Sequence, residues 1–528
     1  LLLFSCARVG APNGGTRDSL APKFLGSNID TTRLNVSRTV KELRLDFDEY
    51  VMLKDFNKNF NVSPPIKKIK KVIPSNLANK YVLIQWEDTL QANTTYNFNF
   101  GNAIVDNNES NPLPYFNFAF STGDKIDDLF VSGTVKDAMT LIKENQTAKD
   151  NKMVVGLYKA GENLDYKQKP DYITKVDEEN YFELNFLPKG EFVIIAFDDE
   201  NQNSVYDAGK EKVSFLKEKI TLDSTSVRGL KLKLYPSKKV VKYKESKAIN
   251  GGLLMTFEGN PETVEVKSLS EELKDFKVTH AKRSDSVNIW FDAEKSNLGG
   301  TVSKQLKLSY FTPTISDTIS VSYKAVKDEF KLSNEAGNLI APENNFVINT
   351  SLPIENLNTS SWKLESDSIA QDFTAKISEK NPFKILVNSS FKPTKKYVLT
   401  IPKETVSSYY SSNDKSFQFQ FEIDKPENYG SFTAVIKNKP TAKFWVELTN
   451  EKGEILYSQF TNASEVSFKN LKPATYIARI RVDNNGNGFW DEADFAQNIA
   501  AEDVYIFEKE INVRPLWEIK EDWELTNR

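Results

Sequence analysis

The chain of 528 residues contains one cysteine, Cys6, and one histidine, His280. A single thiol cannot form an internal disulfide, so disulfides do not stabilise the fold and redox chemistry does not locate the protein. No zinc motif, phosphate-binding glycine loop or nucleophile elbow is present, and His280 is expected to be a structural residue rather than a general base. Although 73 Asp and Glu residues could supply carboxylate pairs, nothing marks out one pair, and we expect no enzymatic activity.

Long apolar runs and an excess of one charge are also missing. No run approaches the ~18 apolar residues needed to span a bilayer. The 69 basic residues are balanced by 73 acidic ones, which leaves no basic surface for nucleic acid. The hydrophobic content of 39%, with 12% aromatic residues, is instead sufficient for several packed cores.

The first six residues, Leu-Leu-Leu-Phe-Ser-Cys, combine an apolar segment with a small residue before the cysteine. This pattern resembles the lipobox of bacterial lipoproteins, with Leu3 and Ser5 at the −3 and −1 positions. The resemblance implies that residues 1–5 are a signal-peptide remnant from a truncated start, and that Cys6 carries acyl chains. Each buried CH₂ group contributes ~0.8 kcal/mol, so more than one chain makes a durable anchor. The alternative is an incidental cysteine in an apolar N-terminus.

Residues 6–19 are small and turn-prone and are expected to form a tether. In residues 20–124, apolar and polar residues alternate at 96–100 and 116–120, which places each apolar set on one face of a strand. This segment resembles the S-layer-type bacterial Ig-like domain. Together with the preceding residues, it resembles Bacteroidota lipoproteins that begin with such a domain. The resemblance implies an outer-membrane, lipid-anchored location and leaves open which face of the membrane is occupied.

Residues 127–236 are similar to the transthyretin-like or carboxypeptidase-regulatory β-sandwich, because apolar strands at 131–135 and 154–158 precede a Leu-Pro-Lys-Gly turn and a further strand at 192–197. Residues 237–328 are rich in strand signals without a specific resemblance, and a β-sandwich is the expected fold. Within them, residues 268–276 are predicted to form one short helix.

The chain also contains an internal repeat. The strand patterns that begin at Tyr96 and Phe116 recur at Tyr397 and Phe417, a constant offset of 301 residues. This repeat predicts a second Ig-like domain at residues 329–426.

A second repeat links the second domain to the last one. Three residues recur at a constant offset of 284 residues, namely Leu187, Phe192 and Asp199 at Leu471, Tyr476 and Asp483. We therefore predict a second transthyretin-like domain at 427–516. The predicted fold class is all-β, a tandem array of five β-sandwich domains behind a lipidated tether. The tail at 517–528 is expected to cap its own domain as a strand, with an aromatic anchor for a partner as the alternative.

Residues 483–494 match the spacing of a calcium-binding loop, with oxygen ligands at positions 1, 3, 5, 9 and 12 and a carbonyl at position 7. Asp stands at position 12 in place of a longer Glu. Because strands flank the loop, a bound Ca²⁺ would be structural. The alternative is an Asn-Gly turn without metal. The predicted ligands are Asp483, Asn485, Asn487, Asp491 and Asp494 by side chain, and Phe489 by its carbonyl.

The cognate loop of the second domain keeps positions 1, 3, 5 and 9 but departs further from the pattern. Ser204 replaces the glycine, and position 12 is Lys210, with Glu211 one place later. The expected affinity of such loops is about 10⁻⁴–10⁻³ M, as in extracellular modules. The predicted ligands are Asp199, Asn201, Asn203 and Asp207, with the carbonyl of Val205.

These features predict a membrane-anchored, non-catalytic scaffold or docking subunit of an outer-membrane protein complex. Its expected partners are outer-membrane proteins or other lipoproteins, and one specific version is the assembly or stabilisation of barrel proteins. The alternative is a glycan-binding surface lipoprotein, in which Trp86, Trp290 or Trp490 would stack on sugar rings. An enzyme would need a pocket with convergent carboxylates of strongly perturbed pKa.

Overall fold

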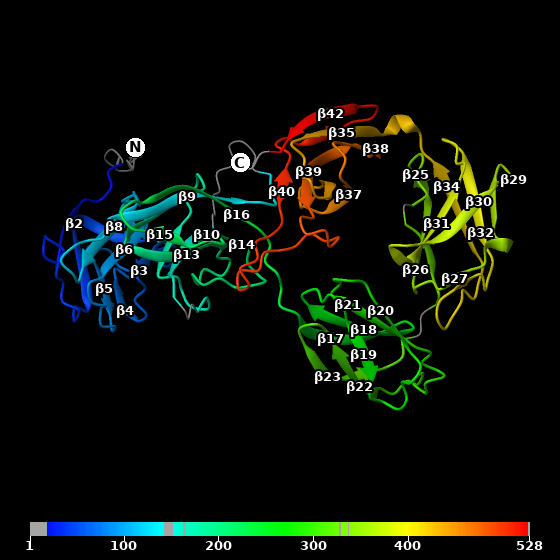
Figure 1. The fold of residues 1–528 in the computed structure, drawn as a ribbon, viewed down its shortest axis with the longest axis horizontal. Helices are drawn as coiled ribbons and strands as arrows, with labels where there is room; N and C mark the ends of the chain where they lie inside the picture. Colours follow the sequence, from blue (N-terminus) through cyan, green and yellow to red (C-terminus); the bar gives the residue numbers. More distant parts are fainter. Residues whose placement is uncertain (1–17, 142–151, 162–164, 327–328, 336, 526–528) are drawn as a thin grey trace, which may run out of the picture. The chain divides into compact units, whose positions relative to one another are not determined.

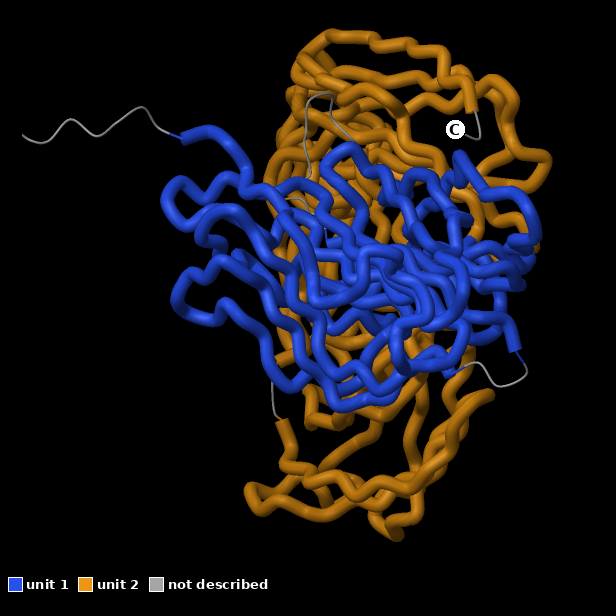
Figure 2. Tube along the Cα trace, turned by 90° about the vertical axis from the view of Figure 1, so that its left-hand side faces the viewer, with its two compact units in different colours: residues 1–138, 143–237, 492–501 blue, residues 139–142, 238–491, 502–528 orange. Residues whose placement is uncertain are grey.

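The computed structural model describes residues 18–141, 152–161, 165–326, 329–335 and 337–525, so the predicted lipidation site Cys6 lies outside the described residues. The chain forms two compact units (Figure 2). Unit 1 contains residues 1–138, 143–237 and 492–501, and unit 2 contains residues 139–142, 238–491 and 502–528. Within the described residues, no helix is long and apolar enough to cross a bilayer.

Unit 1 begins with a β-sandwich whose alternating strands pack Phe98, Phe118 and Trp86 into one core. Its first sheet has the order β1 (Phe24–Ser27), β2 (Glu42–Leu53), β5 (Asn79–Trp86) and β4 (Ile69–Ile73), with β7 (Ile104–Asp106) on β2. Its second sheet has the order β3 (Asn61–Ser63), β6 (Thr95–Gly101) and β8 (Phe116–Ser121). The one-turn helix α1 (Phe56–Asn59) precedes β3. The strands of the second sheet can be followed in Figure 1 by their labels β3, β6 and β8.

The second sandwich of unit 1 has a three-stranded and a five-stranded sheet. The first contains β12 (Tyr181–Leu187), β9 (Leu129–Asp137) and β16 (Val227–Leu234). The second contains β11 (Tyr172–Lys175), β10 (Met153–Lys159), β13 (Gly190–Asp198) and β14 (Val213–Phe215), with β15 (Ile220–Leu222) on β13.

The larger sheet of this second sandwich is apolar on both faces. On β13, Ile194 and Ala196 point into the main core, whereas Ile195 and Phe197 belong to a second cluster on the opposite face. This two-sided burial explains why residues 193–197 are a continuous apolar run instead of an alternating one.

A segment from near the end of the chain covers that opposite face. Residues 492–501 are part of unit 1, and the ring of Phe495 lies 4.4 Å from Tyr166, 5.2 Å from Phe215 and 5.9 Å from Tyr206, measured between centroids. Phe495 is only 6% exposed. The cover is therefore supplied by residues almost 300 positions away in the sequence.

The first sandwich of unit 2 is made of two sheets. One sheet has the order β17 (Lys242–Ile249), β18 (Gly252–Glu258), β21 (Ser286–Trp290) and β20 (Lys277–His280). The other has the order β19 (Glu265–Ser268), β22 (Lys304–Phe311) and β23 (Ser316–Tyr323). The short helix predicted at 268–276 is wrong, because β19 runs to Ser268 and turns follow. The Ser268 hydroxyl accepts the N–H of Ser270 (3.2 Å), and such local bonds compete with helix formation.

The next sandwich of unit 2 is built around one core that includes Phe346, Tyr397 and Phe421. Its first sheet contains β24 (Leu332–Asn334), β26 (Phe346–Thr350), β31 (Asn381–Ser389) and β30 (Phe373–Ser378). Its second contains β25 (Leu339–Ile340), β34 (Phe417–Ile423), β32 (Lys396–Ile401), β28 (Lys363–Ser366) and β29 (Ile369–Ala370), and a small sheet pairs β27 (Asn356–Leu357) with β33 (Val406–Ser407).

The last sandwich of unit 2 has the sheet topology of the second one. Its first sheet has the order β38 (Glu465–Leu471), β35 (Gly430–Lys437) and β42 (Glu518–Glu524). Its second sheet has the order β37 (Ile455–Thr461), β36 (Phe444–Thr449), β39 (Ala474–Val482) and β40 (Val504–Ile506), with β41 (Ile511–Val513) on β39. The tail forms β42, and Trp523 is buried in the core of its own domain. The tail therefore caps its domain, as expected.

The structure reproduces both repeats. Tyr96 pairs with Phe120, and Tyr397 pairs with Phe421, at the same offset of 301 residues. Each of these tyrosine hydroxyls accepts a backbone N–H five residues upstream, at 2.9 Å from Gln91 and 2.8 Å from Lys392. The chain is thus an all-β array of β-sandwich domains, as the strand patterns predict.

Candidate metal loops and a polar cleft

The loop that begins at Asp199 turns its side chains toward its own backbone. The Asp199 carboxylate accepts the N–H groups of Asn203 and Ser204, both at 3.0 Å. The Asn201 amide donates to Asp207 (2.6 Å). Ser204 adopts a left-handed backbone with φ 62°, which costs a non-glycine residue about 1 kcal/mol.

The loop that begins at Asp483 has the same geometry. Its carboxylate accepts the N–H groups of Asn487 (3.0 Å) and Gly488 (2.9 Å), and the amides of Asn485 and Asn487 donate to Asp491 at 2.5 and 2.7 Å. Gly488 has φ 82°, the equivalent of Ser204. In both loops, a hydrogen bond therefore joins the side chains at positions 3 and 9, and the carboxylate at position 1 accepts the backbone N–H groups of positions 5 and 6.

A glutamate closes each loop. Glu211 accepts the N–H groups of Glu200 (3.1 Å) and Asp207 (2.9 Å), and Glu502 accepts those of Asn485 (3.1 Å) and Asp491 (2.9 Å). Burial raises the pKa of Glu211 to about 7 and also raises the pKa of Glu502. Both glutamates are buried beside further carboxylates, an arrangement that a bound cation would stabilise.

Asp494, the predicted closing ligand, has a different hydrogen-bond partner in this structure, and it stays a predicted ligand. Its carboxylate accepts the N–H of Gln497 (3.2 Å) within a turn, and residues 492–501 belong to unit 1. Glu502 occupies the closing position because this segment is inserted between positions 9 and 12 of the predicted loop. The carbonyls of Phe489 and Val205 stay predicted ligands.

The donor set of each loop fits a hard cation, since it consists of carboxylate and amide oxygens. No group of three or more His, Cys, Asp or Glu side chains with metal-site geometry occurs in the described parts of the chain, and two of the predicted side-chain ligands in each loop are Asn. The loops differ in one neighbour. Arg283 donates to Asp491 at 2.7 Å, and hydrogen bonds from Asn485 and Arg283 outweigh burial and lower the pKa of Asp491.

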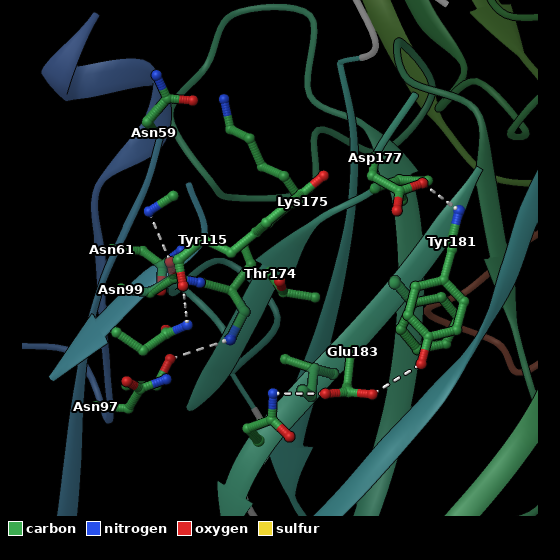
Figure 3. A pocket seen from close by; sticks show the side chains of 18 of the residues that line it. Asn59, Asn61, Asn97, Asn99, Tyr115, Thr174, Lys175, Asp177, Tyr181 and Glu183 are labelled. Atoms are coloured by element: carbon green, nitrogen blue, oxygen red, sulfur yellow. Dashed lines mark hydrogen bonds between the residues drawn. The ribbon is translucent and has the colours of Figure 1, made fainter. Parts of the chain in front are cut away.

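A polar cleft of about 730 Å³ lies within unit 1 (Figure 3). One of its walls is the outer face of the sheet β3-β6-β8. Because Phe98 is fully buried in the core, its neighbours Asn97 and Asn99 point to the opposite face. The strand register places Asn99 between Asn61 and Asn117. These residues form a row of amides across three strands.

The opposite wall of the polar cleft comes from β11, β12 and the turn between them. Tyr181 donates its hydroxyl proton to Glu183 (2.7 Å), and the Asn185 amide donates to the same carboxylate (2.9 Å). The N–H of Ile173 donates to the Ser63 hydroxyl at 3.3 Å and links the two walls. The cleft therefore lies between strands of the first and second sandwiches of unit 1.

The cleft contains an unsatisfied acceptor. Asn97 is 7% exposed, and its side-chain oxygen has no hydrogen-bond partner in the described structure. The rim carries Tyr115, which is 69% exposed, and its backbone N–H donates to Asn102 (3.2 Å). The sequence analysis did not identify this cleft.

The tryptophan platforms predicted for glycan capture are largely absent. Trp86 and Trp290 are buried in domain cores, and their rings cannot stack on a ligand. Trp490 is half-buried and donates its indole N–H to the carbonyl of Glu502 (3.1 Å). His280 lies on β20 with Nε2 3.0 Å from the carbonyl of Ser284, which fits its predicted structural role.

Comparison with known proteins identifies one domain. Residues 18–122 match the family model of the bacterial Ig-like domain. This match confirms the Ig-like domain that the strand pattern predicted at residues 20–124. No curated protein matches the chain.

Among solved structures, the chain is similar to the S-layer protein rSbsC(31-844), with 12% identity, coverage of 93% of this chain and 67% of that chain, and a TM-score of 0.15. It is also similar to BcpA, the major pilin subunit of Bacillus cereus, with 11% identity, coverage of 76% and 99%, and a TM-score of 0.14. Scores this low support no functional conclusion.

Proposed function

We propose that this chain is a non-catalytic docking subunit of an outer-membrane protein complex, anchored through acyl chains on Cys6. The observation that carries the proposal is the composition of unit 1, in which two consecutive sandwiches and the late segment 492–501 form one compact body. A chain that closes on itself in this way presents a preformed surface, whereas a string of separately linked domains would move freely. The bacterial Ig-like match at 18–122 is in keeping with a role in contact rather than catalysis.

An exposed edge supports the same proposal. Among the strands that the structure describes, β37 pairs with β36 alone. Its side chains Ile455, Leu456 and Phe460 are all exposed. Apolar side chains on an unpaired strand edge favour association with another protein. In the proposed docking role, a protein partner would cover this strand edge.

The test is purification from membranes in mild detergent through a C-terminal tag, after crosslinking. We expect outer-membrane proteins or lipoproteins in stoichiometric amounts, identified by mass spectrometry. A Cys6→Ser variant of the precursor should leave the membrane fraction while keeping its fold. Recovery of the monomer alone from wild-type membranes would contradict the docking role.

We also propose that both Asp/Asn loops bind Ca²⁺ as a structural ion. At the expected Kd of about 10⁻⁴–10⁻³ M, about 10 mM Ca²⁺ is 10 to 100 times Kd and stabilises the folded state by about 1.4–2.7 kcal/mol per site. Adding Ca²⁺ at this concentration should raise the melting temperature measured by calorimetry, and EDTA should reverse the rise. Asp199→Asn and Asp483→Asn should each remove part of the response. Asp494→Asn is the matched control and should retain all of it. An unchanged melting temperature in Ca²⁺ would exclude both sites.

A further inference from the structure

We infer that the polar cleft of unit 1 binds a neutral, polyhydroxylated ligand, namely a short stretch of an uncharged polysaccharide. This inference goes beyond the docking role and stands whether or not the chain has a protein partner. The volume of about 730 Å³ lies within the range of small-ligand pockets. Its walls are strands of two packed sandwiches, so the site is preformed.

The amide row determines which chemical groups the cleft can recognise. Asn61, Asn99 and Asn117 lie on adjacent strands at consecutive register positions, where side chains are about 4.5–5.5 Å apart. Each amide has a donor end and an acceptor end. A sugar hydroxyl is likewise both donor and acceptor, so a row of amides is complementary to a row of hydroxyls.

Asn97 provides an independent observation that points to a ligand. A buried acceptor without a partner costs about 1–3 kcal/mol, and such groups are rare in folded proteins. Asn97 lines the cleft beside the amide row. A ligand hydroxyl that reaches this floor would supply the missing hydrogen bond, directly or through one bridging water.

Two tyrosines supply apolar contact. Tyr115 and Tyr181 are 69% and 40% exposed and both line the cleft. The Tyr115 backbone is fixed by hydrogen bonds to Asn102 and from Asn117 (3.2 and 2.9 Å). Aromatic side chains with an apolar face and a polar tip suit a ligand that has C–H faces and hydroxyl edges.

The charges in the cleft argue against an anionic ligand. Its lining contains two lysines, Lys58 and Lys175, against four carboxylates, Asp177, Glu178, Glu179 and Glu183. The negative excess would repel phosphate, sulfate or uronate groups. A neutral oligosaccharide satisfies all these conditions.

The test is isothermal titration calorimetry on the full chain carrying Cys6→Ser, with maltohexaose, cellohexaose and mannohexaose as neutral probes. At least one should bind, and Tyr115→Ala and Asn117→Ala should each weaken it at least tenfold, which corresponds to about 1.4 kcal/mol. Tyr50→Ala, an exposed tyrosine of the same domain outside the cleft, should leave affinity unchanged.

Asn97→Leu separates ligand binding from folding. Because its oxygen is unsatisfied in the free protein, we expect the variant to melt at the same or a higher temperature and still to lose binding. The proposal is overturned if no neutral probe binds, if the cleft variants bind as wild type does, or if only a uronate hexamer or a peptide library binds.

Discussion

Replacing Glu447 by glutamine is expected to destabilise the last sandwich by about 3–5 kcal/mol. Glu447 is fully buried on β36 and bridges two arginines of β39. One carboxylate oxygen accepts from Arg479 Nη2 at 2.7 Å, and the other accepts from Arg481 Nη2 at 2.5 Å. Because guanidinium groups stay protonated in proteins, the variant would leave two cations without a counter-charge, one of them almost fully buried.

Hydrogen exchange read by mass spectrometry can resolve this effect within a multidomain chain. Peptides from β36 and β39 should exchange at least about a hundredfold faster in Glu447→Gln than in wild type. Glu465→Gln is the matched control, because Glu465 forms an exposed pair with Lys520 at 3.2 Å, and such pairs contribute at most about 1 kcal/mol. Equal exchange in the two variants would show that the buried triad does not stabilise the domain.

Replacing Phe495 by alanine is expected to destabilise unit 1 by about 3–5 kcal/mol, the usual cost of deleting a buried aromatic ring. The ring lies among Tyr166, Tyr206 and Phe215, so its loss opens a cavity over the outer face of β13. The effect should therefore appear in a domain distant from the substitution in the sequence.

The readout is faster hydrogen exchange in β10 and β13, together with earlier proteolytic cleavage of residues 153–215. Ile499→Ala provides the control, because this side chain belongs to the same segment but is exposed. If protection in β10 and β13 is the same in Phe495→Ala as in Ile499→Ala, the segment does not contribute to the stability of unit 1.

The two repeated sandwiches show how far the sequence predicts the fold. Alternation places Phe98 and Phe118 in a core, and constant offsets align β13 with β39. In this alignment, Ile195 is equivalent to Arg479, and Phe197 is equivalent to Arg481. The outer face of the sheet is therefore apolar in the second sandwich and charged in the last one. An unbroken apolar run shows that both faces of β13 are covered. It cannot show that Phe495 covers one of them, because that contact is non-local.

The candidate sites were predictable to different degrees. Fixed spacing located the Asp199 and Asp483 loops, since those ligands lie within nine consecutive residues. It did not find Glu502, because an inserted segment separates Asp491 from Glu502. The polar cleft gave no motif at all. In the sequence, Asn97 and Asn99 have the pattern of the solvent-exposed face of an amphipathic strand. That face becomes the wall of a cleft only because the second sandwich packs against it. The only sequence signal for this cleft is that the polar positions of the strand are asparagines.

The position of Phe495 has a consequence for biosynthesis. A chain made from its N-terminus completes residue 215 well before residue 495, and at about 5–20 residues per second the interval is roughly 15–55 s. Throughout this interval, the apolar cluster that contains Ile195 and Phe197 lacks Ala493 and Phe495. During synthesis, the second sandwich therefore exposes part of an apolar surface to chaperones, and this part is covered only after residues 492–501 have been made.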